Sequence, residues 1–92
     1  MRRPRQKPKR LAGKLLAVRA ALGVSQAQMV KSLGAEGMIV PGQISEFETG
    51  KREPSLLVLL RYARLAGVCL DVLVDDELDL PAKLPAKPKH KS

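Results

Sequence analysis

A regular series of glycines in the middle of this 92-residue chain constrains its fold more than any other feature. Apolar residues recur at helical spacing from Leu11 to Leu22, and a glycine follows directly as a C-terminal stop. The glycines that end such segments are Gly23, Gly34, Gly50 and Gly67. Because no stretch alternates cleanly between polar and apolar residues, the pattern favours helices over strands. The sequence therefore predicts an all-α protein.

Helix-start signals complete this division of the chain. Ser25 stands three residues before Gln28, which is the spacing of a capping box at a helix N-terminus. Pro41 suits a first helical turn, where its missing N–H would have no partner, and Ser55 suits the N-cap of the next helix. The predicted helices span residues 11–22, 26–33, 41–49, 56–66 and 70–75.

Charge divides the chain into three parts. Residues 1–10 carry six Lys and Arg and no acid, residues 11–80 carry seven against nine Asp and Glu, and residues 81–92 carry four and no acid. The two ends are rich in Pro and Lys and have little to bury, so we expect disordered basic N- and C-terminal arms around one domain over 11–80. The net charge of +8 favours a polyanionic partner.

Few residues are available for catalysis or metal binding. The single cysteine, Cys69, excludes an intramolecular disulfide and a multi-cysteine zinc site, and the single histidine, His90, excludes a site built from several histidines. The longest aliphatic run, Leu56–Leu60, is far shorter than the roughly 20 residues of a membrane span. We therefore expect a cytoplasmic protein that is not an enzyme, binds no metal or cofactor and has no membrane partner.

Residues 44–55, which read ISEFETGKREPS, carry a resemblance to a known family. Together with Ser25-Gln26, Leu59-Leu60 and Gly67-Val68, they resemble the Xre/Cro-type helix-turn-helix family of phage-repressor-like regulators. The resemblance covers about residues 11–75. It implies a compact five-helix domain whose third helix lies in the DNA major groove while the second crosses above it. The implied function is a sequence-specific regulator of transcription, a repressor, that binds double-stranded DNA.

The resemblance also assigns roles to individual residues. By position these are Pro41, Gly42, Gln43 and Glu46 for base reading, Gln26, Lys51 and Arg52 for phosphate contact, and Arg19 with Glu48 as a structural ion pair. Gln43 can pair with adenine through two hydrogen bonds, and Glu46 can accept one from cytosine N4, although a solvated helix residue is the alternative for Glu46. Because proline and glycine bring almost no hydrogen-bonding side chain, specificity rests on few contacts or on DNA shape.

The N-terminal arm adds Arg2, Arg3 and Arg5, for which three interpretations remain. These arginines bind phosphates without sequence preference, which we rank first, or enter the minor groove, or serve only for solubility. An acidic segment, residues 71–80, has two interpretations: a solvated helix end, or a segment that folds against a basic arm and competes with DNA. The C-terminal arm has the same interpretations as the N-terminal one.

The turn before the third helix departs from the family pattern. Ile44 lies ten positions after Gly34, where the family usually has about six, and the extra length falls in Ala35–Val40. The angle between the second and third helices is therefore left open by the sequence.

Partners other than DNA follow from the fourth helix, which is apolar on more than one face. We expect Leu56, Leu59, Leu60 and Ala63 to face the core and Leu57, Val58 and Leu65 to lie on another face. That second face would cover the fifth helix, the loop at 38–40 or another copy in a homodimer. The alternative function is an antitoxin-like module that binds a toxin protein and regulates its own operon. A further alternative is a nucleoid-type protein whose arms dominate binding.

Overall fold

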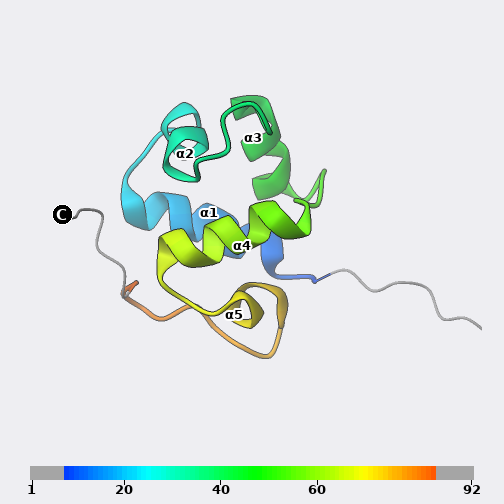
Figure 1. The fold of residues 1–92 in the computed structure, drawn as a ribbon. Coiled ribbons are helices and arrows are strands. Elements are labelled where there is room, and N and C mark those ends of the chain that lie inside the picture. Colours follow the sequence, from blue (N-terminus) through cyan, green and yellow to red (C-terminus); the bar gives the residue numbers. More distant parts are fainter. Residues whose placement is uncertain (1–7, 85–92) are drawn as a thin grey trace, which may run out of the picture.

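Five helices make up the part of the chain that the computed structural model describes, residues 8–84, and no strand occurs there (Figure 1). They are α1 (Leu11–Leu22), α2 (Gln26–Ser32), α3 (Pro41–Thr49), α4 (Leu56–Ala66) and α5 (Leu70–Val74). The predicted all-α fold is confirmed, and every predicted helix is present with its ends within one residue. Arg2, Arg3 and Arg5, and the C-terminal arm from residue 85, lie outside the described residues.

The helix ends form as their local sequence signals indicate. Ser25 accepts the backbone N–H of Gln28 at 3.1 Å, and the Gln28 side chain accepts the N–H of Ser25 at 2.8 Å, which completes the capping box. At the end of α3, Gly50 adopts a left-handed conformation with φ of 79°. This turn lets the N–H of Lys51 reach back to the carbonyl of Glu46 at 2.9 Å. The start of α2 and the end of α3 are therefore specified by local sequence.

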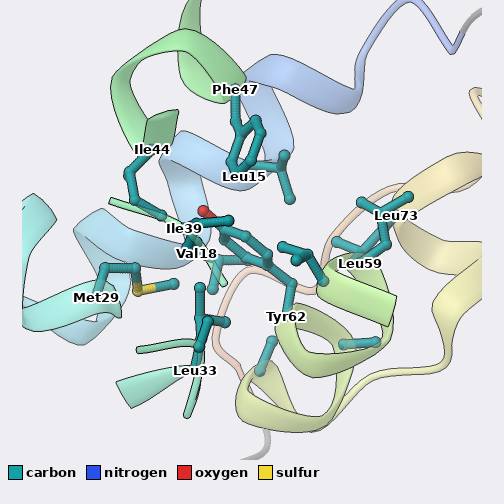
Figure 2. Packing of buried hydrophobic residues seen from close by; sticks show 14 of the residues in the cluster. Leu15, Val18, Met29, Leu33, Ile39, Ile44, Phe47, Leu59, Tyr62 and Leu73 are labelled. Atoms are coloured by element: carbon teal, nitrogen blue, oxygen red, sulfur yellow. The ribbon is translucent and has the colours of Figure 1, made fainter. Parts of the chain in front are cut away.

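The core is aliphatic around two aromatic rings, Phe47 and Tyr62. Tyr62 extends from α4 into the space between α1 and α3, where Val18, Ile39 and Ile44 surround it (Figure 2). The largest side chains without exposed surface are Tyr62, Leu15, Met29, Ile44, Leu73 and Val18, which come from all five helices. One continuous core therefore unites the helices, as expected for a domain of this size.

The face that α4 turns to the core differs from the predicted one. The buried stripe follows Val58, Leu59, Tyr62, Ala63 and Ala66, whereas Leu56 is 71% exposed and Leu60 is only half-buried. The expectation that Leu56 and Leu60 belong to the core and Val58 does not is therefore wrong. The helix is rotated so that Tyr62, its largest side chain, occupies the centre of the buried face. The same rotation leaves two consecutive leucines of the first turn in solvent.

A buried lysine connects α1 to the C-terminal part of the domain. Lys14 is 4% exposed, and its ammonium donates hydrogen bonds to the carbonyls of Val72, Asp75 and Leu78 at 2.7, 2.9 and 2.7 Å. An ammonium has three donors, so these contacts satisfy it completely. They also satisfy carbonyls at the end of α5 and in the turn after it, where a helix leaves such groups without partners. Lys14 therefore fixes α5 and the following turn against α1.

The acidic segment after α5 contacts the root of the basic N-terminal arm. The carboxylate of Asp76 accepts the backbone N–H groups of Lys9 and Arg10 at 2.9 and 3.0 Å, and the Arg10 guanidinium pairs with Asp79. These backbone hydrogen bonds hold the pKa of Asp76 below its ordinary value. Asp76 acts as a cap for α1 in the sense that it accepts the N–H of Arg10, the N-cap residue, whose own side chain makes no cap hydrogen bond. The acidic segment thus folds against the arm at these residues, and its competition with DNA stays a prediction.

The chain beyond α5 continues to contribute to the globule. Leu80 and Leu84, both partly buried, pack against the core cluster. The sequence places the start of the C-terminal arm at Pro81, so Leu84 contacts the domain from within the predicted arm. The sequence most simply predicts Cys69 to be a small, half-buried apolar residue. In the structure Cys69 stands at the N-cap of α5 without a side-chain cap hydrogen bond and is exposed, so that prediction is wrong.

Candidate nucleic-acid interface

Helix α3 is held against the domain by its apolar face. Ile44 has no exposed surface and Phe47 is 3% exposed, and both belong to the core that α1 and α2 share. Pro41 at the first position of α3 supplies no N–H, which is tolerated there because the first N–H groups of a helix have no intrahelical acceptor. The opposite face of α3 is left for other partners: Pro41 and Gly42 are exposed, and Gln43 and Glu46 are half-buried.

An ion pair fixes the rotation of α3 relative to α1. The Arg19 guanidinium approaches the Glu48 carboxylate through two nitrogens, with Nε–Oε2 at 2.6 Å and Nη2–Oε1 at 3.0 Å. A third donor, Nη1, reaches the carbonyl of Val24 at 3.0 Å. The Glu48 side chain is 5% exposed and that of Arg19 is 20% exposed. The hydrogen bond to Glu48 raises the pKa of Arg19, so the guanidinium stays protonated.

Gln26, the first residue of α2, is half-buried beside this ion pair. Its amide nitrogen lies 3.4 Å from Oε1 of Glu48, so it contacts the same carboxylate as Arg19 does. The N-terminus of α2 is therefore joined to α3 through a shared acceptor. Phosphate contact by Gln26 stays a prediction. If Gln26 binds a phosphate, its contact with Glu48 limits the orientation of its amide group.

Gln43 has a structural role at the start of α3. Its side-chain oxygen accepts the backbone N–H of Val40 at 3.0 Å, which is one half of a capping box; Val40 has no polar atom to supply the other half. The amide nitrogen of Gln43 remains a donor for an acceptor on a base edge, such as adenine N7. Base reading by Gln43 stays a prediction.

Glu46 and Arg52 contact each other across the end of α3. Oε1 of Glu46 lies 2.6 Å from Nε of Arg52, and the two side chains are 40% and 52% exposed. The backbone supports this pairing, because the carbonyl of Glu46 also accepts the N–H groups of Lys51 and Arg52 at 2.9 and 3.2 Å. Lys51, which the resemblance also assigns to phosphate contact, is exposed. The structure thus brings a predicted base reader and a predicted phosphate contact into one ion pair.

The lengthened turn between α2 and α3 is held by burial of its own side chains and by hydrogen bonds from α4. Ala35 has no exposed surface and Ile39 is 8% exposed, so both ends of the inserted segment pack into the core. From α4, Arg61 donates to the carbonyls of Leu33 and Gly34 at 3.3 and 3.1 Å. Because Arg61 and Ile39 hold the turn on both sides, the extra residues do not release α3 from α2. Sequence reasoning missed Arg61, since its partners are backbone carbonyls that no side-chain pattern marks.

Two other kinds of functional feature are absent from the part of the chain that the structure describes. Within 8–84, no group of three or more His, Cys, Asp or Glu is arranged to hold a metal ion. No helix of that part of the chain is long and apolar enough to cross a membrane.

Comparisons with known proteins identify a matching family and a similar fold. A family model described as Helix-turn-helix matches residues 15–73. Among solved structures, the P22 c2 repressor protein in complex with synthetic operator 9T in the presence of Tl+ is similar, with a TM-score of 0.62 and 24% sequence identity. That match covers 72% of this chain and 94% of the other, and it shows a shared fold. No curated protein matches this chain.

Proposed function

The chain belongs to the helix-turn-helix family, and we propose that it is a sequence-specific regulator of transcription that binds double-stranded DNA and acts as a repressor. In this proposal α3 lies in the major groove and α2 crosses above it. The observation that carries the proposal is the way α3 is held. Its apolar face is buried through Ile44 and Phe47, the Arg19–Glu48 pair fixes its rotation, and the face with Gln43 and Glu46 remains accessible.

The division of charge supports separate sources of affinity and specificity. Residues 8–84 carry ten Lys and Arg against nine Asp and Glu, although the whole chain has a net charge of +8. Four of the basic side chains in that part are Arg10, Lys14, Arg19 and Arg61, and all four are hydrogen-bonded within the domain. The domain thus supplies shape and base contacts, and the terminal residues supply most of the salt-sensitive attraction to phosphates.

The proposal is tested by selecting bound duplexes from a random DNA library at physiological salt and sequencing them. Enrichment of one motif is the expected result, and an inverted repeat would support a two-fold homodimer with one α3 in each half-site. Gln43→Ala should relax the choice of base at one position of each half-site, since a base contact is worth about 1–3 kcal/mol. Ser32→Ala, at an exposed residue on the far end of α2, is the matched control. Good binding at low salt without any enriched motif would contradict the proposal and favour a nucleoid-type protein.

Exposed apolar side chains favour a second candidate, the antitoxin-like module. Leu56 and Leu57 in the first turn of α4 are 71% and 49% exposed, and Met38 and Val40 in the turn before α3 are 42% and 59% exposed. Such side chains suit contact with another protein. Co-purification of one specific protein with the tagged chain, lost in Leu56→Ser/Leu57→Ser, would support this candidate. Sedimentation as a monomer with no co-purifying protein would contradict it.

A further inference from the structure

Glu46 occupies a position on α3 where a free carboxylate is unfavourable for DNA binding. DNA phosphates carry one negative charge per about 1.7 Å of duplex, so an unpaired carboxylate at the interface is repelled. In the structure Glu46 is paired instead, at 2.6 Å from Nε of Arg52. Among residues 8–84, Glu46 is the single hydrogen-bond partner of the Arg52 guanidinium. The charge of Glu46 is therefore compensated by a side chain of the same surface.

The geometry of this pair leaves the terminal nitrogens of Arg52 free to donate to another acceptor. The contact uses Nε, so the two terminal nitrogens, Nη1 and Nη2, keep their N–H donors for another acceptor. Those nitrogens can bind one phosphate, because a guanidinium matches the spacing of phosphate oxygens. The Arg52 side chain is 52% exposed, so without the contact to Glu46 it would sample many rotamers. Glu46 restricts them in advance.

Backbone hydrogen bonds also hold Arg52 close to Glu46. The left-handed turn at Gly50 returns the chain so that the N–H groups of Lys51 and Arg52 both donate to the carbonyl of Glu46. Arg52 is thus connected to Glu46 through its main chain and its side chain. Recognition helices read base edges mainly through their N-terminal residues, whereas Glu46 lies in the second half of α3 and its side chain is directed to the residues that follow the helix.

Resting on the proposed function, we propose that Glu46 is a positioning residue that holds the Arg52 guanidinium ready for a DNA phosphate, and that it does not select a base. Base selection then falls to the first turn of α3 and to DNA shape. Two consequences distinguish this role from cytosine reading. The selected sequence should not depend on Glu46, and the effect of Glu46 on affinity should depend on Arg52.

A double-mutant cycle on the full chain tests the proposal, with affinity measured on the duplex that the wild type selects. Arg52→Ala should weaken binding about tenfold and reduce the salt slope by about one phosphate contact. Glu46→Gln should weaken binding about threefold in the wild-type background, because the guanidinium loses its fixed orientation. In the Arg52→Ala background the same change should instead tighten binding about two- to threefold, because it removes a carboxylate without a partner. Glu36→Gln, which removes one exposed charge in the turn, should act equally in both backgrounds.

The double-mutant cycle and the repeated selection distinguish positioning of Arg52 from base reading. A reversal in sign between the two backgrounds, with the selected motif unchanged by Glu46→Gln, supports the positioning role. An equal effect in both backgrounds, or a changed base in the motif selected by Glu46→Gln, overturns it while the proposed function stands. A wild-type chain that selects and binds no duplex overturns the proposed function together with this inference. Thermal unfolding of each variant checks that the fold is unchanged.

Discussion

Two charged side chains of α1 are removed from most of their contact with water, and both are satisfied by groups far away in the sequence. Arg19 reaches Glu48 on α3, and Lys14 reaches three carbonyls at and after the end of α5. The first contact was predicted, because the helix-turn-helix pattern marks both positions. The second was not, because a backbone carbonyl is present at every residue and leaves no signal in the sequence. Through these two contacts α1 positions α3 on one side and α5 with its following turn on the other.

Removal of one partner of the Arg19–Glu48 pair should destabilise the domain. We expect Glu48→Ala to lower the free energy of unfolding by about 2–3 kcal/mol, because Arg19 is left mostly buried, without its carboxylate and with only the Val24 carbonyl as an acceptor. Urea unfolding followed by circular dichroism measures this. The double variant Arg19→Met/Glu48→Leu, which removes both charges, should lose less than Glu48→Ala alone. Unfolding of Glu48→Ala at the wild-type urea concentration would show that the pair does not hold α3.

At the scale of elements, helix starts and ends were predictable and helix faces were less so. A capping box at Ser25 or a glycine stop at Gly50 involves residues a few positions apart, so the sequence shows it directly. The buried face of α4 depends on where Tyr62 fits among residues of α1 and α3, which is a property of the assembled core. The prediction for that face therefore failed although the helix itself was found. The lengthened turn is the other element whose geometry needed tertiary contacts, from Ile39 and Arg61.

The conformation of this turn should depend on Gly34. Its φ of +65° lies in the left-handed region, and an added Cβ would come within 3.0 Å of Nη1 of Arg61. We expect Gly34→Ala to lower the free energy of unfolding by about 1–2 kcal/mol. Gly42→Ala is the control, because Gly42 is helical and nothing lies within 4 Å of its added Cβ; it should be neutral or stabilise by up to about 1 kcal/mol. Equal unfolding of both variants would contradict the strained turn.

The cap that Asp76 provides for α1 should make stability depend on pH. Hydrogen bonds from Lys9 and Arg10 lower the pKa of Asp76 in the folded state, so its contribution is complete above about pH 4 and is lost as pH falls through the folded pKa. The melting temperature of the wild type should exceed that of Asp76→Asn by a constant amount near neutral pH. This difference should shrink below about pH 4.

A neighbouring carboxylate provides the control for Asp76. The exposed side chain of Glu77 makes no hydrogen bond to a residue in the described part of the chain, so Glu77→Gln should follow the wild type at every pH. A difference between the wild type and Asp76→Asn that persists unchanged to pH 2.5 would show that the carboxylate charge does not contribute to the cap.

At the scale of the whole molecule, a nearly neutral domain is combined with strongly basic ends. Removal of residues 1–7, which carry four basic and no acidic side chains, should weaken DNA binding and reduce its salt dependence. The selected motif should stay the same, since base contacts are assigned to α3. Affinity measured against salt concentration, with a repeated library selection, checks both expectations. A changed motif after the deletion would instead support minor-groove reading by the arm.

Methylation protection on the selected duplex measures whether α3 lies in the major groove. Dimethyl sulfate methylates guanine N7 in the major groove and adenine N3 in the minor groove, so the two grooves are reported separately. We expect the full chain to protect guanine N7 within each half-site, and the Gln43→Ala variant to lose protection next to the position it relaxes. Protection of adenine N3 alone, or no protection at a concentration that saturates the duplex, would show that α3 does not lie in the major groove.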